Sequence, residues 1–471
     1  MGGEYEAFFA RGAMPVTKTN NRWPARATFP RRAGDGFEAV PALVNAVPAA
    51  PYVGRSRFVL TPLSLSLDQL LFLITAALLC SGLVVVQIAY SRVRTSGEHW
   101  LMASFNNKNA IHALVALLAM TAMWRMDYRW FLGKTGGRFS LLRSPATWLT
   151  LVTIGLLVAV LATPFGKEIN GARRWFALGP IGFQPSELAK LSLVLFVAAY
   201  AVHRADKIHS FLWGFLPVMA IFGITAALVV KEDFGTTVLI AAVVLLMTLM
   251  AGVRLWQLAL LIPPIGLVIY KMLNTPWRRE RLLAYRNPWA ESQGAGYHLI
   301  QSLLSISSGG WFGLGLGNGI QKMGYLPEDN TDFIFAVICE ELGFVGAAMV
   351  VLLFAAFVVV GWRVMSRSQN LFGKLVAFGI TAIVGLQAAI NVAVVTASMP
   401  TKGIALPLIS SGGTGWIMNA AAIGVLMSIE RVNRMEARGI RAIDPGRGFP
   451  VEVQALPVVA ALPAVNAVAA A

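Results

Sequence analysis

The sequence has few of the residues from which soluble proteins build disulfide frameworks or metal sites. Its two cysteines, Cys80 and Cys339, fall inside apolar stretches and indicate small buried residues. The five histidines show no metal-ligand spacing. Only 13% of the residues are charged, against about 25% in a typical soluble protein. With 56% hydrophobic residues, this composition excludes a large soluble protein and predicts an integral membrane protein.

The excess of basic residues, a formal net charge of +16, does not indicate nucleic-acid binding. These residues are spread over loops and termini rather than gathered in one domain. Contacts with phospholipid head groups and the preference for positive charge on the cytoplasmic side of a membrane account for most of them. We expect no signal peptide, because the first long apolar run begins near Leu65 and is long enough to span a membrane.

About ten apolar stretches follow, each close to the ~20 residues that a bilayer core requires. Their approximate limits are 66–90, 110–126, 146–164, 185–203, 211–230, 234–252, 255–273, 332–362, 371–397 and 406–430. We predict an all-α integral membrane protein of about ten transmembrane helices, with one large extracytoplasmic loop, about 274–331, between the seventh and eighth. Residues 63–435 form this membrane domain, and residues 1–62 and 436–471 are predicted to be disordered cytoplasmic tails, the first basic and the second Ala/Pro-rich.

An even number of spans with basic tails places both termini in the cytoplasm and the long loop outside. Several arginines then lie on the outer side, among them Arg173, Arg174, Arg279 and Arg286. One explanation is an anionic ligand at the outer face. The other is contact with acidic phospholipids, or tolerance of charge in a long loop.

The segment 297–346 is the long interval of the second half that is not simply apolar. It contains a glycine-rich run without the GK[ST] of a P-loop, the acids Glu328 and Asp329, and then Asp332 where an apolar helix begins. Asp332 is either an acid favoured by the helix dipole or a general base at the membrane surface. Glu340 and Glu341 lie inside the apolar stretch, which favours structural acids that face the bundle.

Two further constellations contain cations. Gln184-Pro185-Ser186-Glu187 opens an apolar stretch, and Lys190 follows one turn after Glu187, so the two form an intrahelical ion pair or face a central cavity with Arg174. Thr401-Lys402-Gly403, followed by LPLISSGGTG, is either a flexible turn or an anion-friendly loop before the last helix.

Four blocks resemble the shape, elongation, division and sporulation (SEDS) family of polytopic peptidoglycan glycosyltransferases. They are RRWFALGPIGFQPSELAK, the Asp-Phe-Gly-Thr segment 233–236, the signature region with YHLIQSLLSISSGG, GLGLGNGIQ and LPEDNTDFIFAVICEELGFVG, and PTKG followed by LPLISSGGTG. The resemblance covers about 66–435 and is closer to the division branch. This chain departs from the family pattern with Glu232 for Pro, Asn330 for His, Ser411 for Tyr, and Thr414-Gly415 for two serines.

The resemblance implies an enzyme that polymerises lipid II by inverting glycosyl transfer, with Asp332 as the general base. It further implies a location in the cytoplasmic membrane at the division site and a class B penicillin-binding protein as partner. The leaving diphosphate is expected to be balanced with or without a divalent cation, and a Mg²⁺ or Mn²⁺ ion, where one is used, would bridge Asp332 and the diphosphate. The residues expected to bind substrate are Arg174, Glu187, Lys190, Arg279, Gln301, Lys402, Ser410, Gly412 and Gly413.

Two functions of other classes use the same features. A lipid II flippase would need the cavity and the cations but not Asp332 as a base. A non-catalytic division scaffold would need the outer acids only for contacts.

Overall fold

The structure is a computed structural model, and it describes residues 65–90, 108–135, 140–169, 172–178, 181–294, 296–320, 325–327 and 330–438. The predicted tail at 1–62, most of the tail at 436–471, and Glu328 and Asp329 lie outside the described residues.

The described residues are mainly helical, as predicted. The α-helices are α1 (Leu67–Tyr90), α3 (Lys108–Arg125), α4 (Pro145–Ala162), α5 (Pro185–His203), α6 (Leu216–Val229), α7 (Phe234–Met250), α8 (Leu255–Ala259), α9 (Ile262–Leu273), α10 (Pro276–Arg286), α11 (Tyr297–Gly309), α12 (Ile334–Arg367), α13 (Leu371–Val395) and α14 (Gly413–Ala437). Short turns of 3-10 helix are η1 (Tyr128–Phe131), η2 (Leu141–Arg143), η3 (Ala205–Lys207) and η5 (Pro288–Glu291), and the π-helical turn η4 (Phe211–Phe215) leads into α6.

Six helical segments among the described residues are long and apolar enough to cross a membrane. They are Leu67–Ile88, Pro145–Ala162, Pro185–His203, Phe211–Val229, Ile334–Arg367 and Leu371–Val395. The other predicted spans contain α3, α7, the pair α8 and α9, and α14, so the number ten remains a prediction. The seventh predicted span is not continuous, because the chain turns at Leu260 and Leu261. Helix α9 then begins at Ile262, with Pro263 and Pro264 in its first turn.

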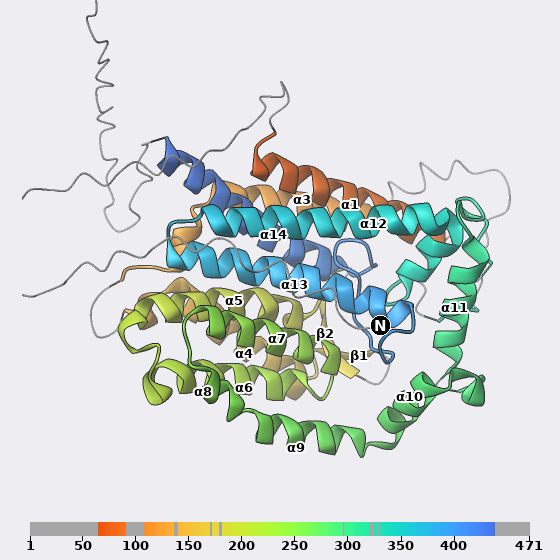
Figure 1. Ribbon diagram of the computed structural model, residues 1–471, viewed down its shortest axis with the longest axis horizontal. Coiled ribbons are helices and arrows are strands. Elements are labelled where there is room, and N and C mark those ends of the chain that lie inside the picture. Colours follow the sequence, from red (N-terminus) through yellow and green to blue (C-terminus); the bar gives the residue numbers. More distant parts are fainter. Residues whose placement is uncertain are drawn as a thin grey trace, which may run out of the picture. The chain divides into compact units, whose positions relative to one another are not determined.

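Helices α5 and α13 lie at the centre of the bundle, and Figure 1 shows α1, α3, α12 and α14 on one side of them and α4, α6 and α7 on the other. In α5, 83% of the most apolar stretch of the helix is buried, whereas 28% of the corresponding stretch is buried in the segment Phe211–Val229, which contains α6. Nearly every side of α5 therefore contacts protein, and α6 presents most of its surface to the surroundings. Helices α9, α10 and α11 form an arm along the edge of the bundle (Figure 1).

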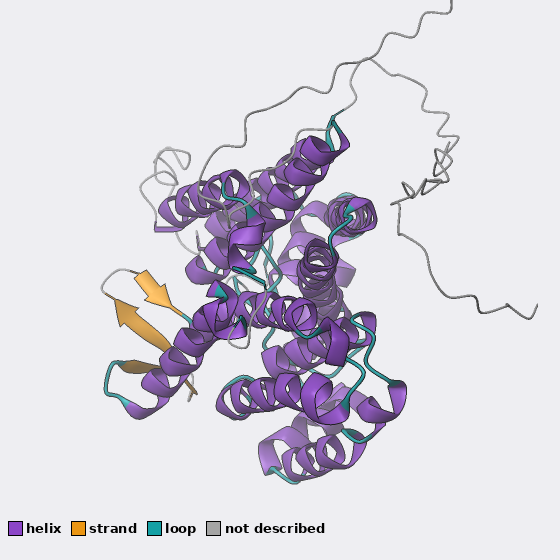
Figure 2. Ribbon diagram, turned by 90° about the vertical axis from the view of Figure 1, so that its left-hand side faces the viewer, coloured by secondary structure: helices purple, strands orange, loops and turns teal. Residues whose placement is uncertain are grey.

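A small antiparallel sheet, which the sequence did not predict, lies at the edge of the bundle (Figure 2). Its strands follow the order β1 (Gly166–Ile169), β2 (Ala172–Leu178) and β3 (Ile181–Phe183). Phe176 pairs with Gly166 on one side and with Phe183 on the other, and the β1–β2 register shifts between Lys167 and Glu168. The sheet places Arg173 and Arg174 just before α5.

The predicted outer loop at 274–331 contains α10, η5 and α11, followed by a glycine-rich segment folded against α12. Gly343 breaks α12 with φ 66°, and a Cβ there would lie 2.3 Å from the amide nitrogen of Gly313. The carboxylates of Glu340 and Glu341 are buried and accept the amide protons of Ile320 (2.7 Å) and Gly317 (3.3 Å). These two acids therefore hold the glycine-rich segment in place, in the structural role expected from their position.

Candidate functional site

Asp332 lies in the turn before α12 and is half-buried. The N-cap of α12 is Phe333, so Asp332 precedes the cap position. A Cβ atom on Gly403 would lie 2.8 Å from Oδ2 of Asp332. The carboxylate is therefore directed to the loop between α13 and α14, here called the 396–412 loop, at a point where Gly403 is exposed.

Lys402 precedes Gly403 in this loop and brings a positive charge to the same region. Its Nζ lies 4.7 Å from the ring centroid of Phe234, a cation–π contact, and its side chain is half-buried. Burial lowers the pKa of Lys402 below that of an exposed lysine. A bound anion would counter this cost of burial by stabilising the charged ammonium.

The far end of the 396–412 loop is fastened to the residues before Asp332. The Ser410 hydroxyl donates to the carbonyl of Thr331 (2.6 Å) and accepts from the amide of Leu406 (2.7 Å), while the amide of Ser411 donates to Asn330 (2.8 Å). Ser410 is buried, so it acts on this region by shaping the loop.

Helix α14 begins at Gly413, later than the predicted span at 406–430, and its first turn faces the sheet and α3. The amides of Gly415 and Trp416 donate to the carbonyl of Gly412, 2.5 and 3.3 Å away. The Thr414 hydroxyl bonds to Gly182 before β3 ends, and a Cβ on Gly413 would lie 2.5 Å from Nε2 of His112. A glycine at position 413 thus allows α14 to pack closely against His112 of α3. The start of α14, where the helix dipole is positive, lies at the same end of the bundle as Asp332.

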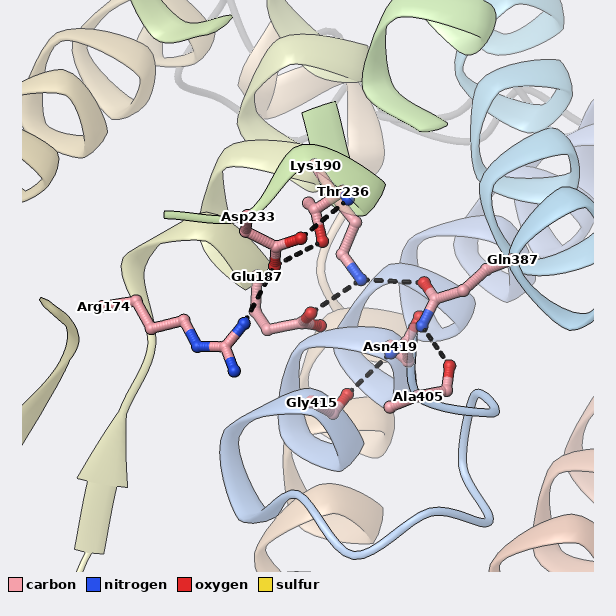
Figure 3. Close-up of polar contacts among 9 residues, drawn as sticks. All are labelled: Arg174, Glu187, Lys190, Asp233, Thr236, Gln387, Ala405, Gly415 and Asn419. Atoms are coloured by element: carbon pink, nitrogen blue, oxygen red, sulfur yellow. Dashed lines mark hydrogen bonds and ion pairs between the residues drawn. The ribbon is translucent and has the colours of Figure 1, made fainter. Parts of the chain in front are cut away.

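Arg174 of β2 reaches Asp233, a residue that the sequence analysis did not select. Asp233 caps α7 by accepting from the amide (2.9 Å) and hydroxyl (2.8 Å) of Thr236, and Nη1 of Arg174 lies 3.8 Å from its Oδ2 (Figure 3). Burial raises the pKa of Asp233, and the Thr236 hydrogen bonds and Arg174 oppose that rise. The capping pattern of an Asp three residues before Thr was the available signal.

Glu187 and Lys190 form the predicted ion pair in the first turns of α5, with 2.8 Å between Oε1 and Nζ. Lys190 is 4% exposed, and its Nζ also donates to Oε1 of Gln387 on α13 (2.8 Å). Gln387 in turn donates to the carbonyl of Ala405 in the 396–412 loop (2.8 Å; Figure 3). The pair thus belongs to a polar chain that reaches the loop beside Asp332.

Arg279 and Gln301 do not take part in these contacts. Arg279 is exposed on α10, and Gln301 is half-buried on α11. Their helices are nevertheless attached near the start of the 396–412 loop, α10 by a hydrogen bond from Tyr285 to the Ser398 carbonyl (3.1 Å) and α11 by one from Ser302 to Val395 (2.7 Å).

The described residues contain no group of three His, Cys, Asp or Glu side chains that would hold a metal ion. A divalent cation near Asp332 would therefore need most of its ligands from the substrate and from water.

Comparisons with known proteins agree on one family. The family model of the cell cycle proteins FTSW/RODA/SPOVE matches residues 68–435. The "probable peptidoglycan glycosyltransferase FtsW" of Legionella pneumophila is 40% identical over 294 residues, which are 61% of this chain and 74% of that protein. The protein of the same name in Geobacter metallireducens is 36% identical over 364 residues, which are 77% and 94% of the two chains.

Solved structures show the same fold. A chain of a peptidoglycan synthase complex, described as coordinating polymerization and crosslinking, superposes with a TM-score of 0.60 at 25% identity and covers 77% of this chain and 97% of its own. The rod shape determining protein RodA of Thermus thermophilus superposes with a TM-score of 0.53 at 24% identity, covering 77% and 96%. This chain therefore belongs to the FTSW/RODA/SPOVE family of cell cycle proteins.

Proposed function

We propose that this protein is a peptidoglycan glycosyltransferase that polymerises lipid II into glycan strands during cell division. The observation that carries the proposal is the position of Asp332. Its carboxylate is half-buried, precedes the cap of α12, and contacts Gly403 next to the cation Lys402. A base beside a cation suits a reaction in which a hydroxyl loses a proton while a diphosphate departs.

In the proposed reaction, a sugar hydroxyl of one lipid-linked disaccharide attacks the anomeric carbon of another from the side opposite the diphosphate. The new glycosidic bond forms as the bond to the diphosphate oxygen breaks, with inversion at that carbon. Asp332 accepts the hydroxyl proton, a role worth about 10²–10⁴ in rate. The leaving diphosphate takes the electron pair of the broken bond.

The charge on the departing diphosphate is opposed by Lys402 and Arg174, and by Arg279 from the outer arm. Gly412 and Gly413 present the start of α14 to the same space, where the helix dipole favours an anion. Glu187 and Lys190, through Gln387, and Ser410 hold the 396–412 loop beside the substrate. Gln301 on α11 is assigned a direct contact with the substrate. If the reaction uses a Mg²⁺ or Mn²⁺ ion, Asp332 would help to hold it, and the ion would supply positive charge that stabilises the leaving diphosphate.

The likeness to a synthase complex that coordinates polymerization and crosslinking supports a crosslinking enzyme as partner. We assign that role to a class B penicillin-binding protein. The protein acts in the cytoplasmic membrane at the division site, with both termini in the cytoplasm and Asp332 on the outer face.

The test is polymerisation of labelled lipid II by the purified protein with its partner, comparing the wild type with Asp332→Asn. The amide keeps the size of the side chain, so we expect normal folding and partner binding but no glycan strands. Near wild-type polymerisation by Asp332→Asn would refute the assigned base. If the wild type translocates lipid II without polymerising it, the flippase function is correct. If it does neither, and Asp332→Asn supports division, the scaffold function is correct.

A further inference from the structure

Two amide side chains on one face of α13 donate hydrogen bonds to the 396–412 loop. Gln387 and Asn391 are one helical turn apart, and both are buried, 4% and 1% exposed. Gln387 donates to the carbonyl of Ala405 (2.8 Å), and Asn391 donates to the carbonyl of the preceding residue, Ile404 (2.7 Å). Successive loop carbonyls are thus bound by successive turns of the helix.

Asn391 makes a second contact that Gln387 does not make. Its Nδ2 also donates to the backbone carbonyl of Asp332, 2.8 Å away. One NH2 group therefore joins the residue that carries the proposed base to the loop that carries Lys402 and Gly403. Because both partners are carbonyl oxygens, only the NH2 end of the amide can face them.

The remaining atoms of Asn391 indicate why an amide occupies this position. Its Oδ1 is buried and has no hydrogen-bond partner among the described residues. A buried polar atom without a partner costs stability, and an apolar side chain of the same shape would avoid that cost. The contribution of Asn391 therefore lies in the two bonds of its NH2 group.

We infer that Asn391 is a positioning residue for glycosyl transfer, which sets the Asp332 carboxylate against the Lys402–Gly403 turn. This inference rests on the proposed role of Asp332 as base. Asp332 precedes Phe333, the N-cap of α12. Its backbone carbonyl accepts a hydrogen bond from Asn391 of α13, and the neighbouring carbonyl of Thr331 accepts one from Ser410.

Gln387 supports the same arrangement from the other end of the turn. Its Oε1 is bound by Lys190, whose ion pair with Glu187 fixes the amide so that Nε2 points to Ala405. The loop is thereby anchored to α5 as well as to α13 (Figure 3). Asn391, which donates to both Ile404 and Asp332, connects the anchored loop to the backbone of Asp332.

The experiment compares Asn391→Asp and Asn391→Leu with the wild type in steady-state lipid II polymerisation. Asparagine provides two donors, a protonated aspartate provides one, and leucine provides none, at similar volume. Because misplacing a reacting group by about 1 Å can cost about 100-fold in rate, we expect kcat to fall in the order Asn, Asp, Leu, by about 10- to 100-fold for Leu. The KM for lipid II should stay within about threefold, since Asn391 does not touch the substrate.

The matched control is Asn433→Leu. Asn433 is a half-buried amide at the other end of the bundle, where its Nδ2 bonds to the Val364 carbonyl of α12 (3.4 Å). Hydrogen exchange of the purified variants supplies a second measurement. Asn391→Leu should increase exchange in residues 400–411 and leave α5 and α13 protected, whereas Asn433→Leu should change neither kcat nor exchange in that loop.

The inference is wrong if Asn391→Leu keeps the kcat of Asn433→Leu, if its defect lies in KM, or if exchange rises throughout the bundle. If Asn391→Leu does not fold, Asn391→Asp decides by the same criteria. Asp332→Asn in the same assay separates the two proposals. An inactive Asp332→Asn with fully active Asn391 variants refutes only the positioning role, and an active Asp332→Asn refutes the base itself.

Discussion

At the scale of single residues, two aspartates near helix starts have different surroundings. Asp233 caps α7 through Thr236 and is buried beside Arg174, so its carboxylate is committed to structure. Asp332 precedes the cap of α12 and directs its carboxylate to exposed Gly403. The sequence left two explanations open for Asp332, an acid favoured by the helix dipole and a general base, and the second is the proposal that Asp332→Asn tests.

A substitution at Gly403 tests the position of the Asp332 carboxylate directly. In Gly403→Ala the new Cβ would lie 2.8 Å from Oδ2 of Asp332, so the carboxylate must move. A displaced general base predicts a fall in polymerisation rate of about 10- to 100-fold. The melting temperature should change little, because Gly403 is exposed and its φ is not positive. Both quantities are measured on the purified protein.

Gly294→Ala is the matched control for this substitution. Gly294 lies in an exposed turn of the outer arm, and a Cβ there would meet its first neighbour, the Glu291 carbonyl, at 3.8 Å. This variant should polymerise lipid II at the wild-type rate. If Gly403→Ala is as active as Gly294→Ala, the carboxylate does not act from the position described.

At the scale of elements, the small sheet determines where Arg174 lies. Strand β2 is attached to the turn between α6 and α7 by Glu232, whose Oε2 accepts the amide proton of Arg173 (2.8 Å). The residues that follow Arg173 and Glu232 in the chain, Arg174 and Asp233, form an ion pair with 3.8 Å between Nη1 and Oδ2. Glu232 stands where the resembled family usually has Pro, so this chain has its own means of fastening the strand.

Glu232→Ala should loosen β2 and weaken the contribution of Arg174 to substrate binding. The lost hydrogen bond is worth about 0.5–1.5 kcal/mol, which corresponds to a rise of about two- to tenfold in the KM for lipid II. Glu232→Gln keeps an acceptor oxygen and should behave as the wild type. Glu168→Ala is a control on the same sheet. Glu168 is exposed, and its Oε2 lies as far as 4.0 Å from Nε of Arg173, so this ion pair is weak. Equal KM values for all three variants would contradict this role.

Several elements were predictable from apolar length, and others were not, for identifiable physical reasons. Residues 406–412 were predicted as the start of a helix, but Leu406, Leu408 and Ile409 are buried in a loop, with Leu408 at φ 64°. Hydropathy reports burial and cannot distinguish a buried loop from a buried helix. The same limit concealed the break between α8 and α9.

The site was predictable where its residues lie in recognisable motifs. Asp332, Lys402, Arg174 and the pair Glu187–Lys190 were selected in this way. The structure brings Lys190, through Gln387, and Asp332 to the 396–412 loop that carries Lys402, whereas Arg174 pairs with Asp233 at the start of α7. Gln387 and Asn391 were missed because each is one amide within an apolar helix. Their importance arises from carbonyls of the 396–412 loop and of Asp332, which the sequence does not show to be neighbours.

At the scale of the whole membrane domain, ion pairs connect the start of its first helix with the end of its last. Arg434 near the end of α14 pairs with Asp68 in the first turn of α1 (2.6 Å), and Arg367 at the end of α12 pairs with Glu430 of α14 (3.3 Å). A domain whose first helix begins and whose last helix ends at one face is consistent with the predicted even number of crossings. The Arg129–Glu436 pair adds the turn after α3 to this face.

That face carries the arginines of three helix ends, and the rule of positive charge inside assigns it to the cytoplasm. With that orientation we expect Asp332 and Lys402 at the outer face, because α12 and α14 both run from their region toward the arginine-rich face. Cysteine accessibility in intact cells tests this orientation. Replacing Cys80 and Cys339 by Ala removes the native thiols, of which Cys80 is exposed.

In that background, Ala290→Cys in the exposed turn η5 should be labelled by a membrane-impermeant thiol reagent in intact cells. Asn20→Cys and Ala455→Cys, in the two tails, should be labelled only after the membrane is permeabilised, which also shows that each thiol is reactive. Labelling of only one tail in intact cells would refute the even number of crossings. Labelling of both tails with protection of residue 290 would invert the orientation and place Asp332 on the cytoplasmic side, where an extracytoplasmic polymerase could not use it.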